Sequence, residues 1–128
     1  MKDEKVTIDN NNISIVNDGV IDILPIIKLD KPLRVDSKLI IEQDGVRASL
    51  SVPSLDLAQD ENKIVIDCEN GLVRGAYADF TCTNNIYNDY YDGIFPSFAR
   101  ETTTFLRMYF DNSEEPVNAT IEYTKFYL

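Results

Sequence analysis

Apolar and polar residues alternate in short runs along most of the chain, and helical periodicity is scarce. In residues 47–52, for example, Ala48, Leu50 and Val52 alternate with polar side chains. A period of two is typical of a strand that has one face on a core and the other in water. The runs are rich in Val, Ile, Thr, Tyr and Phe and end at Asn, Asp, Gly or Pro, which predicts an all-β chain.

Two hairpins are predicted from glycine-containing turns. Residues 63–69 and 72–74 flank Asn70-Gly71, and residues 39–43 and 46–52 flank Asp44-Gly45. Such dipeptides accept the two consecutive positive φ angles that a tight type I′ turn requires. Each pair of runs is therefore expected to form two antiparallel strands joined by a two-residue turn.

Further strands are predicted elsewhere in the chain. Residues 20–27 are apolar but contain Pro25, which cannot donate a ladder hydrogen bond, so this strand is expected at a sheet edge or ending near the proline. Residues 102–110 and 118–128 are β-rich runs joined by a polar turn, and they are expected to pair with each other. Many short strands with tight turns predict an antiparallel two-sheet β-sandwich or jelly roll.

The length of 128 residues fits one domain with its own core. Residues 13–128 are expected to form a single β-sandwich domain, and residues 1–12 a polar N-terminal tail or a first strand. The N-terminal stretch lacks the apolar segment of a secretory signal, and no later run is apolar and long enough to cross a bilayer. Synthesis in the cytoplasm without membrane insertion is therefore expected.

The chain is acidic, with a formal net charge of −10 and no histidine. This charge repels a phosphate backbone or an anionic lipid surface, so nucleic acid is not expected as a partner. Cys68 and Cys82 are too few for a disulfide framework, and their spacing fits neither a zinc site nor a redox pair. Both are expected to be reduced and buried.

The sequence carries no recognisable catalytic or metal-binding motif. Without histidine, neither a Ser-His-Asp nor a Cys-His arrangement can form, and histidine-ligated metals are excluded. No EF-hand loop, P-loop or dinucleotide fingerprint is present. Residues 111–115 offer oxygen ligands for an irregular calcium site, but a solvated turn is the preferred interpretation. We therefore expect no enzyme activity, no cofactor and no metal.

The most unusual stretch is residues 84–93, in which tyrosines are interleaved with amides and carboxylates. Tyrosine combines a flat apolar face with a polar tip, and Asn and Asp add planar hydrogen-bonding groups, which suits a protein partner or a sugar ring. The alternative is a loop whose tyrosines pack back over the edge of the sandwich. The candidate binding residues are Asn84, Asn85, Tyr87, Asn88, Tyr90, Tyr91 and Asp92.

Several short motifs occur in an order that resembles a known family. They are Val-Asn-Asp-Gly at 16–19, Leu-Pro-Ile-Ile at 24–27, residues 64–68 with Asn70-Gly71, Gly-Ile-Phe-Pro-Ser-Phe at 93–98 and Ala-Thr-Ile-Glu-Tyr at 119–123. From residue 13 to the end, the chain resembles the C-terminal domain of siphophage distal tail proteins. It departs from that family at 99–102, where Ala-Arg-Glu-Thr stands in place of the usual Pro-Gly and Asn.

The resemblance implies a galectin-like β-sandwich that projects outward from the tail tip of a phage or prophage, after synthesis in the bacterial cytoplasm. It implies a structural or adhesion role through contact with other tail proteins, namely the receptor-binding protein and the tail hub, in virion assembly or host attachment. Host cell-wall saccharide is a further implied partner. The alternative function is a carbohydrate-binding module that recognises cell-surface saccharide.

Overall fold

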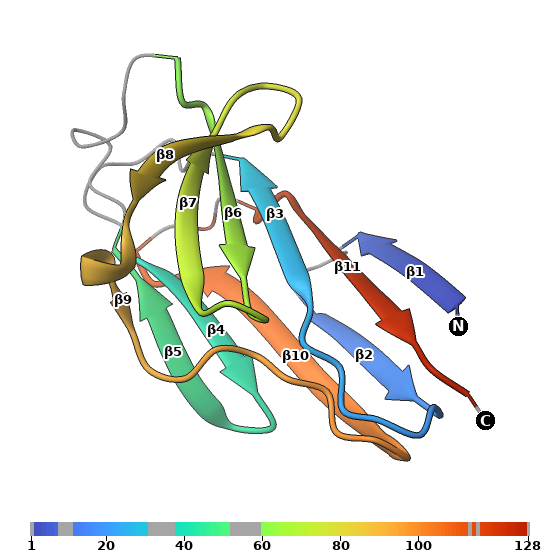
Figure 1. Ribbon diagram of the computed structural model, residues 1–128. Coiled ribbons are helices and arrows are strands. Elements are labelled where there is room, and N and C mark those ends of the chain that lie inside the picture. The colour runs from blue at the N-terminus through green and yellow to red at the C-terminus, as the bar shows by residue number, and fades with distance from the viewer. Residues whose placement is uncertain are drawn as a thin grey trace.

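The computed structural model describes residues 2–7, 12–30, 38–51, 60–112, 114 and 116–127, the first of these ranges by its backbone alone. Within them the chain is almost entirely β-structure (Figure 1). The strands are β1 (Lys2–Thr7), β2 (Asn12–Asn17), β3 (Ile26–Asp30), β4 (Leu39–Gln43), β5 (Val46–Leu50), β6 (Lys63–Asp67), β7 (Leu72–Ala76), β8 (Cys82–Ile86), β9 (Tyr91–Asp92), β10 (Thr102–Phe110) and β11 (Ala119–Lys125), with one 3-10 turn, η1 (Asn88–Tyr90).

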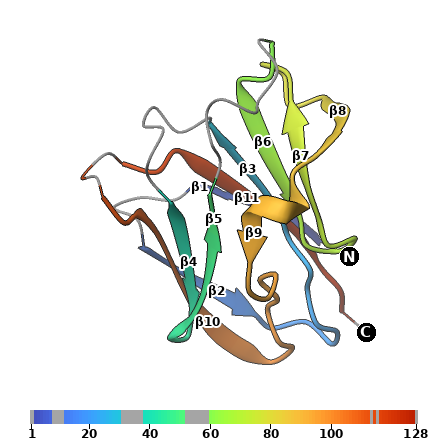
Figure 2. The ribbon, with the colours of Figure 1, turned by 90° about the vertical axis from the view of Figure 1, so that its left-hand side faces the viewer.

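These strands form two antiparallel sheets. The six-stranded sheet has the order β1-β11-β3-β6-β7-β8, and the five-stranded sheet has the order β2-β10-β4-β5-β9. Figures 1 and 2 show the sheets as two facing layers between which the chain crosses repeatedly. The prediction of an all-β chain folded as an antiparallel two-sheet sandwich is confirmed. At the N-terminus, residues 2–7 form an edge strand paired with β11.

The core lies between the two layers. Alternate residues of β10 and β11 are buried, as the period-two pattern requires, and Leu106, Met108 and Ile121 are fully enclosed. Phe98 is also completely buried, and its ring meets that of Tyr123 edge-on at a centroid distance of 5.8 Å. The isolated bridge between Ile23 and Phe98 ties this part of the chain to the segment before β3.

The hairpin predicted around Asp44-Gly45 is confirmed. Gln43 pairs with Val46, so the turn has two residues, and both have positive φ, 48° at Asp44 and 86° at Gly45. These are the angles of a type I′ turn. Ala48 and Leu50 are buried as expected, whereas the expectation for Val52 lies outside the described residues.

The hairpin predicted around Asn70-Gly71 has the expected strands, β6 and β7, but a different turn. Asp67 pairs with Leu72, which leaves a four-residue loop in which Gly71 alone has a positive φ, 63°. The Asp67 carboxylate accepts hydrogen bonds from the backbone N–H groups of Glu69 and Asn70 at 3.1 and 3.2 Å. This aspartate at the strand end satisfies the loop's donors and favours the wider turn.

The expectation of a strand over residues 20–27, at a sheet edge or ending near Pro25, is wrong. β3 starts at Ile26, directly after Pro25, and lies inside its sheet between β11 and β6. Because Pro25 precedes the strand, its missing N–H removes no ladder hydrogen bond, and its carbonyl accepts from the Cys68 N–H at 3.1 Å. The proline therefore marks a strand start.

The expected pairing of the last two β-rich runs is also wrong. β10 pairs with β2 and β4, while β11 pairs with β1 and β3 in the other sheet. Both strands bury alternate residues, so their patterns fit either a hairpin or two facing layers. The two strands lie in different sheets, and alternation of buried residues alone cannot distinguish this arrangement from a hairpin.

The two cysteines differ in exposure. Cys68 is buried, and burial raises the pKa of its thiol to about 12. Cys82 is free as well but exposed on β8, so the expectation that both are buried is wrong for Cys82. It occupies an outward position of an edge strand, where a small side chain meets solvent. Among the described residues, no helix has the length and apolar character needed to cross a membrane.

Candidate functional site

The tyrosine-rich segment predicted to bind a partner is largely engaged within the fold. Tyr87 is only 7% exposed, belongs to the core, and donates its hydroxyl to Glu61 at 2.6 Å. Its ring is therefore not available as a stacking surface. Tyr90 is half-buried against the core, with its ring centroid 6.3 Å from that of Tyr87.

Asn88 and Tyr91 also make structural contacts. The Asn88 side chain accepts from the Val73 N–H and donates to the Gly71 carbonyl, both at 2.7 Å, which fixes η1 against β7. The Tyr91 ring stacks on Phe95 at a centroid distance of 4.4 Å, and its hydroxyl donates to the Ile94 carbonyl at 2.7 Å. These contacts match the packing interpretation of the segment.

Glu61 is the acceptor that organises the start of this segment. It is 1% exposed and accepts from Tyr87, from the Asn85 amide at 3.1 Å and from the Thr83 hydroxyl. Residues 83, 85 and 87 share one face of β8 and its continuation, and Gly75 on β7 leaves the space that the carboxylate occupies. The sequence could not single out Glu61 among 22 acidic residues.

The remaining two predicted residues, Asn84 and Asp92, are exposed. The structure does not bring these two residues together, because Asn84 lies on β8 at the edge of one sheet and Asp92 on β9 in the other. Asp92 pairs with Ser49 of β5 and thus borders the outer face of the five-stranded sheet.

That outer face carries a row of polar side chains that runs across four strands. The register places Asn12 of β2 opposite Arg107 of β10, Arg107 opposite Glu42 of β4, and Glu42 opposite Arg47 of β5. We call these four residues the polar row. They point outward because their neighbours along each strand, such as Leu106 and Met108, are buried.

Glu42 is the centre of the polar row. Its Oε1 accepts from the Arg47 Nε and from the Tyr109 hydroxyl, each at 2.8 Å, and its Oε2 lies 3.8 Å from Arg107. The Arg107 guanidinium in turn lies 4.4 Å from the centre of the Tyr109 ring. The hydrogen bond from Tyr109 and the arginines hold the pKa of Glu42 below its ordinary value, and the same bond raises the pKa of Tyr109.

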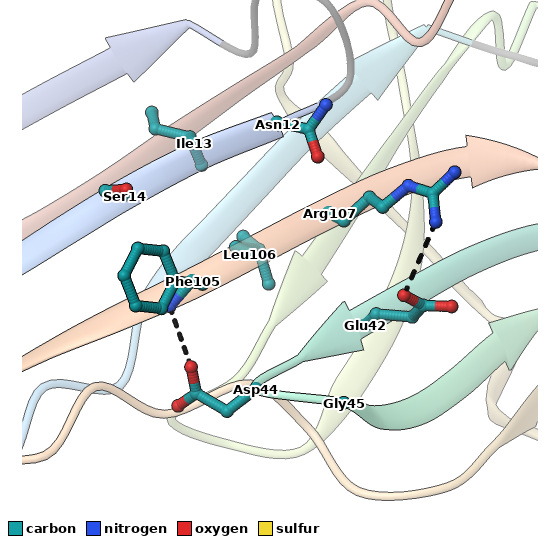
Figure 3. Close-up of a pocket in the computed structure, with 9 residues that line it drawn as sticks. All are labelled: Asn12, Ile13, Ser14, Glu42, Asp44, Gly45, Phe105, Leu106 and Arg107. Atoms are coloured by element: carbon teal, nitrogen blue, oxygen red, sulfur yellow. Dashed lines mark hydrogen bonds and ion pairs between the residues drawn. The ribbon is translucent and has the colours of Figure 1, made fainter.

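Phe105 stands beside the polar row with 62% of its surface exposed. Its backbone is fixed to the β4–β5 turn, because its N–H donates to the Asp44 carboxylate at 2.9 Å and its carbonyl accepts from the Asp44 N–H at 3.0 Å. Figure 3 shows Phe105 and Arg107 projecting from β10, Glu42 from β4, and Asn12 from β2 around a common hollow.

Two hollows lie on this face, one on each side of the polar row. The first has a volume of about 430 Å³ and is lined by Asn12, Ile13, Ser14, Glu42, Asp44, Gly45, Phe105, Leu106 and Arg107 (Figure 3). The second has a volume of about 340 Å³ and is lined by Lys38, Ile40, Arg47, Ala48, Ser49, Asp92, Gly93 and Asp111. Asp92 is thus the one predicted site residue that lines either hollow.

The described residues contain no group of acidic and cysteine side chains arranged to hold a metal ion. In the acidic turn weighed as a calcium site, the Asp111 carboxylate instead accepts from the Lys38 N–H at 3.0 Å. Residues 113 and 115 of that turn lie outside the described residues.

The sequence of β10 contains a pattern on its outward positions that no short motif marks. Phe105, Arg107 and Tyr109 occupy alternate positions of residues 102–110, between buried apolar residues. An aromatic-cation-aromatic series on the solvent face of a strand indicates a recognition surface. Comparison of the chain with family models, curated proteins and solved structures finds no match, so the resemblance to tail proteins depends on the sequence motifs alone.

Proposed function

We propose that this chain is an adhesion domain of a phage or prophage tail tip, which attaches the particle to its host by binding rather than by chemistry. The tail-tip part of the proposal is supported by the ordered sequence motifs and by the β-sandwich fold they imply. The binding part is supported by one observation above all, the polar row with the exposed Phe105 ring on the outer face of the five-stranded sheet.

The polar row is preorganised for binding. Arg47, Tyr109 and Arg107 all converge on Glu42, so contacts within the protein favour one arrangement of these side chains in the absence of a ligand. A ligand that meets fixed groups loses less side-chain entropy on binding, and this increases affinity for a given set of contacts. The supporting strands are rigid elements, which suits a recognition site.

The electrostatics of the face favour binding over hydrolysis. A general acid requires a carboxyl group whose pKa is raised, so that it holds a proton near neutral pH. Glu42 has the opposite shift, because the Tyr109 hydroxyl and the arginines stabilise its charged form. We therefore propose for Glu42 the role of a fixed acceptor that orients Arg107, Arg47 and Tyr109.

The proposal is tested by sedimentation of a fluorescently labelled domain with purified cell walls from a panel of bacterial strains, and by co-purification with a tail hub and a receptor-binding protein. We expect association with walls from a subset of strains. A domain that associates with none of the walls and with neither tail protein would refute an adhesion role.

Gene order separates this proposal from the alternative of a free-standing carbohydrate-binding module. A tail-tip domain is expected beside genes for a tape-measure protein and a tail-associated lysin. A free-standing module also binds cell walls but has no reason to lie among tail genes. Wall binding combined with a gene neighbourhood free of tail genes would favour the alternative.

A further inference from the structure

We propose that the outer face of the five-stranded sheet binds a neutral glycan chain, with sugar units seated in the two hollows on either side of the polar row. This inference rests on the proposed binding function and adds the ligand class and its position. The hollows, of about 430 and 340 Å³, lie at the lower end of the size range of small-ligand sites. Arg47 lines one hollow while Glu42 and Arg107 line the other, so an extended chain can cross between them.

The first hollow has the chemistry that a sugar ring needs. A pyranose has an apolar face of C–H groups and a rim of hydroxyls, so it pairs best with an aromatic ring surrounded by hydrogen-bonding groups. Phe105 supplies the ring, exposed and fixed through its backbone to Asp44. Asn12, Ser14 and Arg107 line the same hollow (Figure 3). The amide and the hydroxyl can donate to and accept from sugar hydroxyls, and the guanidinium can donate to them.

The charges on this face favour a neutral ligand. The two hollows are lined by three cations, Lys38, Arg47 and Arg107, and by four carboxylates, Glu42, Asp44, Asp92 and Asp111. The net charge of the face is therefore close to zero, whereas the whole chain has a formal net charge of −10. An anionic polymer is repelled by the molecule as a whole. A cationic polymer is attracted by the net charge, but it finds little excess of negative charge on this face, where Glu42 is already paired with Arg47 and Arg107. A hydroxyl-rich neutral chain needs no net charge on the face.

The same face is a poor match to the centre of a protein interface. Such centres are enriched in aromatic residues and arginine but depleted of Asp, Glu, Lys and Ser. Arg107 and Arg47 would fit such a centre, but the two hollows beside them are lined by four carboxylates, one lysine and two serines. Alternating polar groups and one exposed aromatic ring suit the hydroxyls and C–H faces of a glycan better.

The test uses an array of neutral and anionic oligosaccharides from disaccharides to hexasaccharides, followed by calorimetry on the neutral probe that binds best. We expect binding to neutral probes only, with hexasaccharides bound more tightly than disaccharides. F105A is expected to lower the affinity by about tenfold or more, because the stacking surface is lost. R107A is expected to weaken binding to a similar extent.

The matched control is I86A. Ile86 is 53% exposed, close to the value for Phe105, but lies on β8 at the edge of the other sheet. Its replacement is expected to change affinity by less than about twofold. D92A tests the second hollow, because it should reduce the factor by which the hexasaccharide binds more tightly than the disaccharide. Circular dichroism and thermal melting of each variant establish that the fold is retained.

The outcomes separate this inference from the proposed function. If cell walls bind but no neutral oligosaccharide does, the glycan assignment is wrong and the adhesion role stands. If neutral glycans bind equally well to F105A and R107A, the location on this face is wrong. If instead F105A abolishes binding of a tail protein and no glycan binds, the face is a protein interface. If the native domain binds no cell wall, no tail protein and no glycan, both proposals are overturned.

Discussion

Among the described residues, tyrosine hydroxyls donate to the carboxylates of Glu61, Glu42 and Asp18, and the first two of these sites differ mainly in burial. Tyr87 donates to Glu61 at 2.6 Å, where both residues are more than nine-tenths buried. Tyr109 donates to Glu42 at 2.8 Å on the outer face, where 16% of the Glu42 side-chain surface is exposed to solvent. The contribution of each hydrogen bond to stability depends on whether water can replace the tyrosine hydroxyl when that hydroxyl is removed.

This difference gives a matched pair of substitutions. Y87F leaves a buried carboxylate short of a donor that water cannot easily replace, so we expect a loss of about 1–3 kcal/mol in the free energy of unfolding. Y109F removes the same group beside solvent, and we expect a loss below about 1 kcal/mol. Urea denaturation of both variants measures the contrast. Equal losses would show that Glu61 is hydrated in solution.

At the scale of strands and turns, local patterns predicted the elements better than their partners. Residues 102–110 and the Asp44-Gly45 turn are as expected, because alternation and two consecutive positive φ angles are properties of neighbouring residues. The partners of β10 and β11 are not local properties. Each strand could pair within a hairpin or across the sandwich with the same faces buried, so the predicted pairing was wrong.

The candidate site depends on the same non-local information. The polar row exists only because β2, β10, β4 and β5 pair in one register, which joins Asn12 to residues 30 to 95 positions away along the chain. A one-residue slip in any of these pairings would turn a member of the row toward the core. The tyrosine-rich segment attracted attention by composition, but burial assigns most of its rings to packing.

Gly75 shows how one strand position accommodates a side chain from elsewhere. A Cβ atom at this position would lie 1.9 Å from the Glu61 Oε2 and 2.6 Å from its Cδ. We expect G75A to lower the free energy of unfolding by about 1–3 kcal/mol, because Glu61 is held by several hydrogen bonds and cannot move aside freely. Thermal or urea melting measures the loss.

The control for this prediction is Gly45, whose Cβ would meet nothing within 4 Å although its φ is 86°. G45A should therefore cost only the conformational strain of the turn, about 1 kcal/mol. A double-mutant cycle separates the two causes. In an E61A background the cost of G75A should shrink because the clash is gone, while that of G45A should stay the same. An unchanged cost for G75A would contradict the steric explanation.

For the whole molecule, the absence of histidine shapes the dependence of stability on pH. Hydrogen bonds in the folded state lower the pKa of four carboxyl groups. The main donor is Tyr127 for Asp18 and Arg100 for Asp22. It is Thr81 for Asp79 and Tyr109 for Glu42. The unfolded chain therefore takes up protons at a higher pH than the folded chain does. This contribution to stability is present above the unfolded carboxyl pKa and is lost as the pH falls through the folded values.

We accordingly expect the urea midpoint to change little between pH 6 and 8 and to fall below about pH 4.5. E42Q should make the urea midpoint fall less steeply below about pH 4.5, because it removes one group whose pKa is lowered in the folded state. Denaturation curves at matched ionic strength test both statements. A stability transition centred near pH 6.5 would show that a group with a strongly raised pKa dominates instead.

The excess of 22 acidic over 12 basic residues opposes compaction, because like charges are brought together when the chain folds. Added salt screens this repulsion, but it also weakens surface ion pairs such as Lys28–Glu122 and Arg100–Asp22. Exposed pairs contribute only about 0–1 kcal/mol each, so the relief of repulsion should prevail. We expect the melting temperature to rise as NaCl is increased from about 10 to 150 mM, over which the screening length falls from about 30 to 8 Å.

Binding at the outer face should respond differently to the same change of salt. The hollows are lined by nearly equal numbers of positive and negative groups, and a neutral glycan has no charge to be screened. Its affinity should therefore change by less than about twofold over the range of NaCl that raises the melting temperature. Calorimetry at the two salt concentrations measures this directly. A steep fall in affinity with added salt would mean that the ligand on this face is charged. A fall in melting temperature with added salt would mean that ion pairs stabilise the fold by more than the net repulsion destabilises it.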